Sequence, residues 1–482
     1  MGKKNYKILF ISLFNGEALG VRILHSILHH EGYDARLLFL KVPFQNRYNS
    51  TGDVTEKELL LLEDYIREYK PNLIAFSLVS SVFGLYKRIY ERIKGSGEFK
   101  IFLGGWQASL NPEECIKYSD IVCVGEGEDA LLEVADKLFN NQPVDCIDNI
   151  WVKKDNKIIK NPIRPLIQNL SRFPTPVFDD NLSAYIENDE LINKEIYKFN
   201  TRYGIIAGRG CPYSCTYCSN VYMAKNLYPR AWTKIRYRSP EHVISELIDV
   251  KERLPEITRI NFYDEVFLPD KDWVKEFFTR YKQEIALPFY CMFFPGTVKE
   301  DFLKILKESY LAGVWIGVQS GSEKIRKNIF KRNYKNSVIL EQAKLFHQYG
   351  ISVRYDFIFD NPFETFEESL ESVNLMLELP QPFSMNLFSL KYFPHTEITD
   401  MALEAGFISK NDFDDERLSD RDQYGIILTD ENSDNNFINH LVYYINKLAS
   451  QSMLDRKEIH EIIDEYRYSK NINIIKKRVD SM

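Results

Sequence analysis

Short apolar runs alternate with amphipathic segments along most of this 482-residue chain. In residues 1–140 the runs have the length of strands, and segments between them, such as Thr55–Tyr69, show helical spacing. Strands that alternate with helices predict a parallel sheet. The predicted strands are Lys7–Leu13, Ala35–Leu40, Leu73–Val79, Lys100–Leu103 and Ile121–Val124. This half is therefore predicted to be a doubly wound, flavodoxin-like sheet that binds ligands at the carboxyl ends of its strands.

The same alternation resumes after residue 201. The predicted strands there are Tyr203–Ala207, Thr258–Tyr263, Phe289–Phe293, Trp315–Val318, Val353–Phe359 and Met385–Leu390. The predicted helices are Pro240–Arg253, Lys271–Tyr281, Lys299–Ser309, Asn336–Tyr349 and Thr365–Leu379. Six strand–helix units are too few for a closed eight-stranded barrel. They predict an open, partial (β/α)6 TIM barrel with its site at the carboxyl ends of the strands.

The predicted α/β chain has four parts. Residues 1–140 form the first sheet, 141–200 a connector with a hairpin around Ile150–Ile159, 201–400 the partial barrel and 401–482 a C-terminal helical region. In the last part Leu441, Ile445 and Leu448 recur at helical spacing. This apolar face suits a packing layer over the barrel or a partner-docking surface, and we expect the packing layer.

Composition and charge narrow the class of protein. Hydrophobic residues make up 44% of the chain and the formal net charge is −7, without a lysine- and arginine-rich run that would indicate a nucleic-acid partner. The first apolar run is too short to span a membrane and has no small-residue cleavage site, so we expect a cytoplasmic protein. The seven cysteines are an odd number in a long chain, which disfavours a disulfide framework.

Three cysteines, Cys211, Cys215 and Cys218, fall within eight residues directly after the first predicted barrel strand. Thiolates are soft ligands that suit zinc or an iron–sulfur cluster. A zinc site would need a fourth cysteine or histidine nearby, but no histidine lies between His30 and His242. A four-iron cluster usually takes four cysteines, so three leave one iron open to another ligand.

The Cys-x3-Cys-x2-Cys spacing, with Tyr217 before the last cysteine, resembles the signature of the radical S-adenosylmethionine (SAM) superfamily. The resemblance implies a [4Fe–4S] cluster on Cys211, Cys215 and Cys218 whose open iron binds SAM. It implies reductive cleavage of SAM to a 5′-deoxyadenosyl radical, which removes a hydrogen atom from the substrate. It also implies an electron donor such as flavodoxin or ferredoxin.

Other segments resemble SAM-binding parts of the same superfamily. Tyr263-Asp264-Glu265 stands where the family often has Gly-Gly-Glu, and Gly317–Ser322 resembles its G-x-E-S-G-S segment with Gln319 in place of Glu. Asp360–Thr365 resembles its G-x-P-G-E-T turn, although we expect Thr365 to act mainly as a helix cap. The residues expected to contact SAM are Tyr217, Asp264, Glu265, Gln319, Ser320 and Arg354, the last as a bidentate partner of the carboxylate.

A flavodoxin-like unit before a radical SAM barrel resembles the cobalamin-binding class of the superfamily. The residues that match that class, and that we expect to bind cobalamin, are Ser77, Gly104, Gly105, Gly125 and Glu126. Small residues there would let a corrin approach the backbone. The Asp-x-His motif that supplies a cobalt ligand in other cobalamin proteins is absent, and His25, His29 and His30 are expected to pack on the first helix.

The resemblance implies a cobalamin-dependent radical SAM methyltransferase acting on an inert carbon. Two alternatives stay open: radical cyclisation, rearrangement or oxidation without methyl transfer, and a non-catalytic iron–sulfur binding or sensing protein. Substrate contacts decide between the enzymes, and the fold does not. A small-molecule or peptide substrate is expected, without a sequence handle for its identity.

Overall fold

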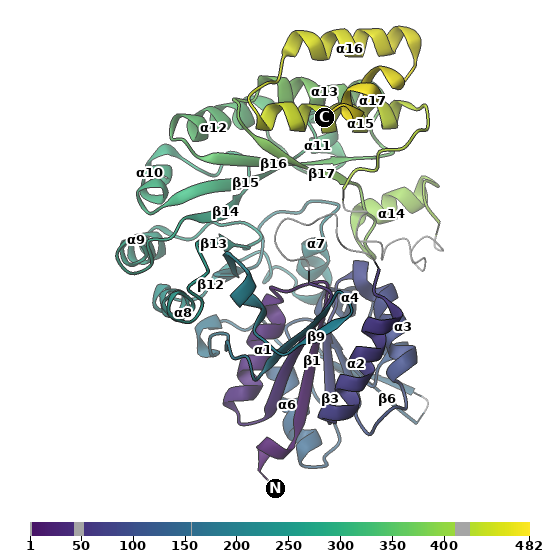
Figure 1. The fold of residues 1–482 in the computed structure, drawn as a ribbon, viewed down its shortest axis with the longest axis vertical. Helices are drawn as coiled ribbons and strands as arrows, with labels where there is room; N and C mark the ends of the chain where they lie inside the picture. The colour runs from purple at the N-terminus through teal and green to yellow at the C-terminus, as the bar shows by residue number, and fades with distance from the viewer. Residues whose placement is uncertain (1, 43–52, 156, 410–424) are drawn as a thin grey trace. The chain divides into compact units, whose positions relative to one another are not determined.

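The computed structural model describes residues 2–42, 53–155, 157–409 and 425–482 (Figure 1). These residues fall into two compact units. The first holds residues 2–212 and 222–261, and the second holds 213–221, 262–409 and 425–482. Within the described residues, none of the helices combines the length and apolar character needed to cross a bilayer.

The first unit is built on a nine-stranded sheet with the order β7-β6-β5-β4-β3-β1-β2-β8-β9. Its strands are β1 (Lys7–Leu13), β2 (Asp34–Leu40), β3 (Leu73–Ser77), β4 (Lys100–Gly104), β5 (Ile121–Cys123), β6 (Ile150–Lys154), β7 (Lys157–Lys160), β8 (Ser183–Glu187) and β9 (Glu190–Ile192). Strands β5, β4, β3, β1 and β2 pair in parallel in that order. This is the flavodoxin-like order, so the predicted fold of the N-terminal half is confirmed.

Alternating side chains of this sheet enter two apolar cores. Leu9 and Ile11 of β1 join the core beneath α2 (Glu56–Tyr69) and α3 (Phe83–Ile93). Ile8 and Phe10 join the core beneath α1 (Leu19–His30) and α6 (Glu128–Phe139). The two helix pairs therefore cover opposite faces (Figure 1), and burial on both faces explains why the strands read as continuous apolar runs.

The predicted connector contributes strands to this sheet, which differs from the expected irregular segment. The expected hairpin is present as β6 and β7, and it extends the sheet beyond β5. Strand β8 pairs in parallel with β2, and β9 pairs with β8. The pairing of β8 with a strand so far back in the chain cannot be read from the local sequence, which explains why β8 was missed. Beyond β9, the buried carboxylate of Glu195 lies 2.8 Å from Arg22 of α1.

The second sheet has six strands in the order β10-β13-β14-β15-β16-β17, which follows the chain. They are β10 (Arg202–Ile205), β13 (Arg259–Phe262), β14 (Phe289–Phe293), β15 (Leu311–Gln319), β16 (Ser352–Phe359) and β17 (Ser384–Ser389). Strands β14 to β17 pair in parallel. The main helices between strands are α8 (Pro240–Arg253), α9 (Lys271–Arg280), α10 (Glu300–Glu308), α12 (Asn336–Gln348) and α13 (Phe366–Glu378). The predicted partial barrel is therefore confirmed.

Side chains of β14 to β17 alternate between two environments. One set is buried, as where Phe289 packs against Phe278 and Tyr281 of the α9 region. The other set is less buried, and we call it the open face. The open face consists of Tyr290, Met292, Trp315, Gly317, Gln319, Arg354, Asp356 and Asn386. The strand pairing places Trp315 beside Arg354 and Gly317 beside Asp356, whose other neighbour is Asn386.

The C-terminal region of the second unit forms α15 (Asp434–Ser450), α16 (Arg456–Ser469) and α17 (Asn473–Asp480), after α14 (Glu397–Glu404). Leu441, Ile445 and Leu448 of α15 are buried, and α15 contacts α13 and β17 (Figure 1). The Asn446 amide bonds both the N–H and the C=O of Met385 on β17, the last strand in the order. The apolar side of α15 is thus used in packing within its own unit.

Candidate functional site

The cysteine loop begins on a short antiparallel ribbon of β11 (Gly208–Arg209) and β12 (Arg236–Tyr237) in the first unit. Gly210 follows with a φ of 110°, and a Cβ there would lie 2.6 Å from the carbonyl oxygen of Trp232. Only glycine fits that position. The N–H of the next residue, Cys211, donates to the same carbonyl at 3.2 Å. The β12 segment therefore sets the path of the chain into the first cysteine.

Cys215 and Cys218 belong to the second unit and sit in one turn, where the Cys218 N–H donates to the Cys215 carbonyl at 3.1 Å. Each sulfur faces a nitrogen donor. Arg332 Nη1 lies 3.4 Å from the Cys215 sulfur, and Asn220 Nδ2 lies 3.6 Å from the Cys218 sulfur. Burial raises the pKa of the Cys218 thiol to about 11, so a metal must displace its proton on binding.

The donor set fits an iron–sulfur cluster in its chemistry. Among the described residues no group of three histidine, cysteine or acidic side chains is already arranged to hold a metal ion. The loop nevertheless offers thiols, the ligands that iron–sulfur clusters take, and N–H groups that point at two of the sulfurs. Such N–H donors are a recognised means of tuning cluster potentials.

Arg332 is a functional candidate that the sequence reasoning missed. It is 6% exposed, and its Nη1 also donates to the hydroxyl of Tyr217 at 3.1 Å. Nη2 donates to the Gly317 carbonyl at 2.5 Å, and the guanidinium lies over the ring of Phe294. These contacts join Tyr217 and the cysteine turn to Gly317 on the open face. No motif surrounds Arg332 in the sequence, and only its burial reveals it.

Gln319 and Ser320 end β15 in a distorted backbone. Gln319 has a φ of 75°, rare for a residue with a side chain, and the pairing with β16 shifts register just before it. Ser320 is buried, and its hydroxyl donates to Glu364 at 3.0 Å. Burial raises the pKa of the Glu364 carboxyl to about 7. Two segments singled out in the sequence thus meet, because Glu364 belongs to the turn before α13.

That turn also confirms the cap expected at its end. The Thr365 hydroxyl accepts from the Glu368 N–H, and the Glu368 carboxylate accepts from the Thr365 N–H. This reciprocal capping box fixes where α13 begins. Because the hydroxyl of Thr365 is used in the cap, Glu364 is the side chain of the turn that contacts Ser320.

The three remaining residues expected at SAM lie in the second unit. Asp264 is 1% exposed, and Glu265 is half-buried close enough to Cys218 for its charge to add to the rise of the thiol pKa. Arg354 is exposed on the open face, and its Nε donates to Ser384 at 3.2 Å. Asp356 lies two residues further on the same face and accepts from Asn386 at 2.7 Å. Burial raises the pKa of Asp356 to about 6.

The structure brings the residues expected at cobalamin together at the carboxyl ends of β3, β4 and β5. The N–H of Leu78 donates to the Gly104 carbonyl at 3.0 Å. The Ser109 hydroxyl donates to the Gly105 carbonyl and accepts from the Gly125 N–H, both at 3.0 Å. Ser77 is exposed beside them. One hydroxyl therefore links the loop after β4 to the loop after β5.

Contacts with neighbouring protein atoms require glycine at both positive-φ positions of this edge. Gly105 has a φ of 88°, and a Cβ there would lie 2.7 Å from the Ser77 hydroxyl and 2.8 Å from the Leu78 backbone. Gly125 has a φ of 89°, and a Cβ there would lie 2.1 Å from the hydroxyl of Tyr228. The small residues were expected to let a corrin approach the backbone, but it is Ser77, Leu78 and Tyr228 that lie against these two glycines. The edge carries three glycines without side chains and the exposed hydroxyl of Ser77, a composition that suits a bulky ligand with polar groups.

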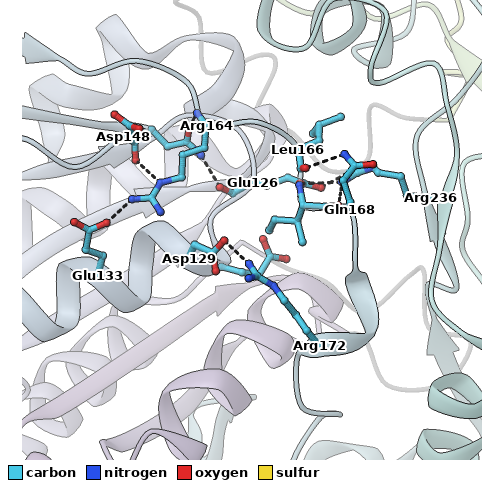
Figure 2. A network of polar contacts seen from close by, with 12 residues as sticks. Glu126, Asp129, Glu133, Asp148, Arg164, Leu166, Gln168, Arg172 and Arg236 are labelled. Atoms are coloured by element: carbon cyan, nitrogen blue, oxygen red, sulfur yellow. Dashed lines mark hydrogen bonds and ion pairs between the residues drawn. The ribbon is translucent and has the colours of Figure 1, made fainter.

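Glu126 is used differently from the other four residues. Its side chain is 7% exposed and lies 2.8 Å from Arg236 (Figure 2). It also lies 3.3 Å from Arg209. Burial acts to raise the pKa of this carboxyl, but the hydrogen bond from Arg236 and the two positive charges outweigh it, so the pKa is lowered. The carboxylate stays ionised and directed at arginines within the unit.

The histidines of α1 lie as expected. The ring of His25 is fully buried, and Nε2 lies 3.1 Å from the Ala35 carbonyl oxygen. Burial lowers the pKa of His25 to about 4. His30 bonds the carbonyl of Ser26 in its own helix at 2.8 Å. Both rings are thus engaged by backbone carbonyls of the first unit, as helix-packing histidines are.

A cavity of about 420 Å³ opens in the first unit just after β1. Phe14 and Asn15 line it on one side, and Arg202 and Arg259 on another. Glu17 also lines the cavity and lies 3.2 Å from Arg202. The cavity is therefore polar and carries a closed ion pair at its wall.

Comparison with known proteins agrees with this architecture. The model of the radical SAM superfamily matches residues 205–376, and that of the B12 binding domain matches residues 10–135. An uncharacterized methyltransferase of Pyrococcus horikoshii is 25% identical over 80% of this chain and 79% of its own. The cytidylyl-2-hydroxyethylphosphonate methyltransferase of Streptomyces wedmorensis is 24% identical over 71% and 69% of the two chains.

A solved structure has the same fold over almost the whole chain. The cobalamin-dependent SAM radical enzyme OxsB, with aqua-cobalamin and SAM bound, superposes with a TM-score of 0.66 at 16% identity, over 96% of this chain and 71% of its own. The fold and the cysteine loop thus define a radical SAM enzyme. With a B12-binding domain before the radical SAM core, the chain belongs to the cobalamin-binding class of that superfamily.

Proposed function

We propose that this protein is a methyltransferase that cleaves SAM at a [4Fe–4S] cluster and passes a methyl group through cobalamin to a carbon atom of its substrate. The observation that carries the proposal is the three-cysteine loop, two of whose sulfurs face N–H donors, in a chain that also has a B12-binding domain. The methyltransferase names of the two relatives support methyl transfer over other radical chemistry.

Cys211, Cys215 and Cys218 would hold the cluster. When bound, the cluster supplies the electron that cleaves SAM, and cobalamin supplies the carrier for the methyl group. Arg332 and Asn220 donate N–H groups toward the sulfurs of Cys215 and Cys218. Such donors stabilise the reduced, more negative cluster and raise its potential. A flavodoxin or ferredoxin is the proposed electron donor.

SAM would lie against the open face of the second sheet. Tyr217, Asp264, Glu265, Gln319, Ser320 and Arg354 remain the proposed contacts, and Arg332 and Asp356 join them. Asp356 lies on the open face beside Gly317, and a carboxylate there can accept from an ammonium or a hydroxyl. Arg332 carries a fixed positive charge next to the cysteine turn, which suits a carboxylate ligand.

Cobalamin would rest on the edge formed by Ser77, Gly104, Gly105 and Gly125. Ser77 is the exposed polar group there, and the glycine turns keep the surrounding surface low. Glu126 would hold the loop after β5 in place through its ion pairs with Arg209 and Arg236. The sequence has no Asp-x-His motif, so no histidine is proposed to hold the cofactor.

The test needs no knowledge of the substrate. The protein is reconstituted anaerobically with iron and sulfide, reduced, and given SAM with and without cobalamin. We expect 5′-deoxyadenosine in both mixtures and S-adenosylhomocysteine only with cobalamin. Deoxyadenosine alone would favour radical chemistry without methyl transfer, and intact SAM would favour a non-catalytic binding protein.

Cysteine variants complete this experiment. Cys215→Ala should lose the absorption band of the cluster and the deoxyadenosine. Cys146→Ser is the matched control, because Cys146 is an exposed cysteine outside the loop, and it should keep both. Equal behaviour of the two variants would contradict the assignment of the cluster to this loop.

A further inference from the structure

The ribbon that leads into Cys211 carries two arginines on facing positions. Arg209 of β11 pairs directly with Arg236 of β12. Their side chains are 21% and 4% exposed. Like charges directly opposite each other on a sheet repel, and buried charges without partners are costly. The ribbon therefore depends on carboxylates from elsewhere in the chain.

Those carboxylates come from one loop of the B12-binding domain, Gly125-Glu126-Gly127-Glu128. Glu126 accepts from Arg236 Nη1 at 3.0 Å and from Nη2 at 2.8 Å, which is a bidentate pair, and from Arg209 at 3.3 Å. Glu128 lies 2.6 Å from Arg209. Two arginines thus meet two carboxylates in a nearly dry cluster (Figure 2 shows Glu126 and Arg236).

Two further hydrogen bonds hold Glu126 in place, one at its backbone and one at its carboxylate. Its N–H donates to Tyr228 at 3.0 Å, and its second carboxylate oxygen accepts from the Ile167 N–H at 2.9 Å. The residue before it is Gly125, whose N–H is bonded to Ser109 at the proposed cobalamin edge. The residues after Arg209 are Gly210 and Cys211. A continuous set of hydrogen bonds and ion pairs therefore runs from that edge to the first cysteine.

We propose that Glu126 is a positioning residue that couples cobalamin binding to the cluster loop. Cobalamin seated on the Gly105–Gly125 edge would fix the loop that holds Glu126, and Glu126 would fix the ribbon that aims Cys211. Coupling between two sites is reciprocal, so a bound cluster must tighten cobalamin by the same factor. This inference rests on the proposed binding of cobalamin and adds to it a coupling with the cluster loop.

The experiment measures the Kd of cobalamin by corrin absorbance, in full-length protein with and without the cluster. Wild-type protein should bind cobalamin at least roughly 5-fold more tightly when the cluster is present, the lower end of typical coupling. In Glu126→Gln this ratio should fall to about one while cobalamin still binds, because the neutral amide leaves Arg236 without its carboxylate and Arg209 with Glu128 alone. No turnover is needed for this measurement.

Arg172→Gln is the matched control. Arg172 pairs with Asp129 on the same helix that follows the loop, with 45% of its side chain exposed and no link to the ribbon (Figure 2). It should keep the wild-type ratio. If Glu126→Gln fails to fold, Arg209→Gln tests the same connection from the ribbon side and should also lower the ratio to about one.

The outcomes separate this inference from the proposed function. A wild-type ratio of one, or a wild-type ratio kept in both Glu126→Gln and Arg209→Gln, overturns the coupling and leaves cobalamin binding intact. Wild-type protein that binds no cobalamin in either state overturns the proposed function and the coupling together. A ratio lost equally in Arg172→Gln would assign the effect to general loosening of the unit and overturn the role of Glu126.

Discussion

Arg332 reaches the sulfur of Cys215, with Nη1 3.4 Å from Sγ, although 117 residues separate the two in the chain. The same guanidinium bonds Tyr217 and the carbonyl of Gly317. It therefore connects the cysteine turn with the end of β15. This buried cation lies where the chemistry is proposed.

Replacement of Arg332 by lysine should lower the rate of SAM cleavage roughly 10- to 100-fold, because hydrogen bonds to a charged group contribute about 1.5–3 kcal/mol. Lysine keeps the charge but cannot supply the planar fork of donors. Anaerobic 5′-deoxyadenosine formation is the measurement, with iron content checked for cluster loading.

Arg354→Gln is the comparison, since Arg354 was the arginine expected at the SAM carboxylate and is exposed on the open face. A loss of SAM affinity in Arg354→Gln, with Arg332→Lys unaffected, would show that Arg354 and not Arg332 anchors SAM.

Glu364 should make stability depend on pH. Burial raises its folded-state pKa to about 7 from an unfolded value of 4.5. Its contribution is therefore fully present below pH 4.5 and is lost as pH rises through 7. The free energy of unfolding of Glu364→Gln, relative to wild type, should therefore rise by on the order of 2–3 kcal/mol from pH 5 to pH 8.

Urea unfolding at the two pH values measures this difference. Glu367→Gln is the control, because the Glu367 side chain is 68% exposed three residues further along. A pH profile shared by Glu364→Gln and wild type would contradict the assignment.

Asn446→Ala should destabilise the second unit by about 1–3 kcal/mol. The substitution leaves both backbone groups of Met385 without their bonds, at 2.7 and 3.1 Å, on the strand that ends the sheet. Thermal unfolding measures the loss. Lys447→Ala, at the neighbouring exposed position, should change the midpoint little, and a similar loss in both variants would indicate a helix effect instead.

Gly105→Ala should cost more than backbone strain alone. The new Cβ would meet the Ser77 hydroxyl and the Leu78 backbone within 2.8 Å, at a φ of 88°. Gly95→Ala is a control with the same kind of strain, because Gly95 has a φ of 77° and nothing within 4 Å of a Cβ. We expect about 1–2 kcal/mol for Gly95→Ala, and a larger loss together with weakened cobalamin binding for Gly105→Ala. Equal losses would mean that the contact relaxes freely.

The sequence predicts the repeating parts of this fold well because their signals are local. Strand β1 and helix α8 lie at their predicted bounds, since apolar periodicity and a proline at the helix start mark them. Strand β8 was missed, because its partner β2 lies far back in the chain. The C-terminal region was correctly predicted to be helical, and in the structure it consists of α15, α16 and α17 after α14.

For the candidate site, the sequence indicated many of the residues involved, but it did not predict which groups their side chains contact. The five residues expected at cobalamin came from the resemblance to the cobalamin-binding class, and four of them form one edge. Glu126 was expected to touch the ligand, but its charge is taken up by Arg209 and Arg236, two residues that no motif marks. Arg332 was missed for the same reason: a buried guanidinium depends on acceptors that only the folded chain brings to it.

The ion pair between Arg22 and Glu195 can form during synthesis only after the ribosome has added Glu195. Both side chains are almost fully buried, and 173 residues separate them. At ~5–20 residues per second, the ribosome adds the partner of Arg22 roughly 10–30 s after Arg22 itself. Until then the nascent chain has Arg22 without its carboxylate, and before residues 183–187 are made β2 lacks its partner β8. A fragment that stops at residue 140 would lack both Glu195 and β8, so an isolated cobalamin domain needs the chain to continue past Glu195.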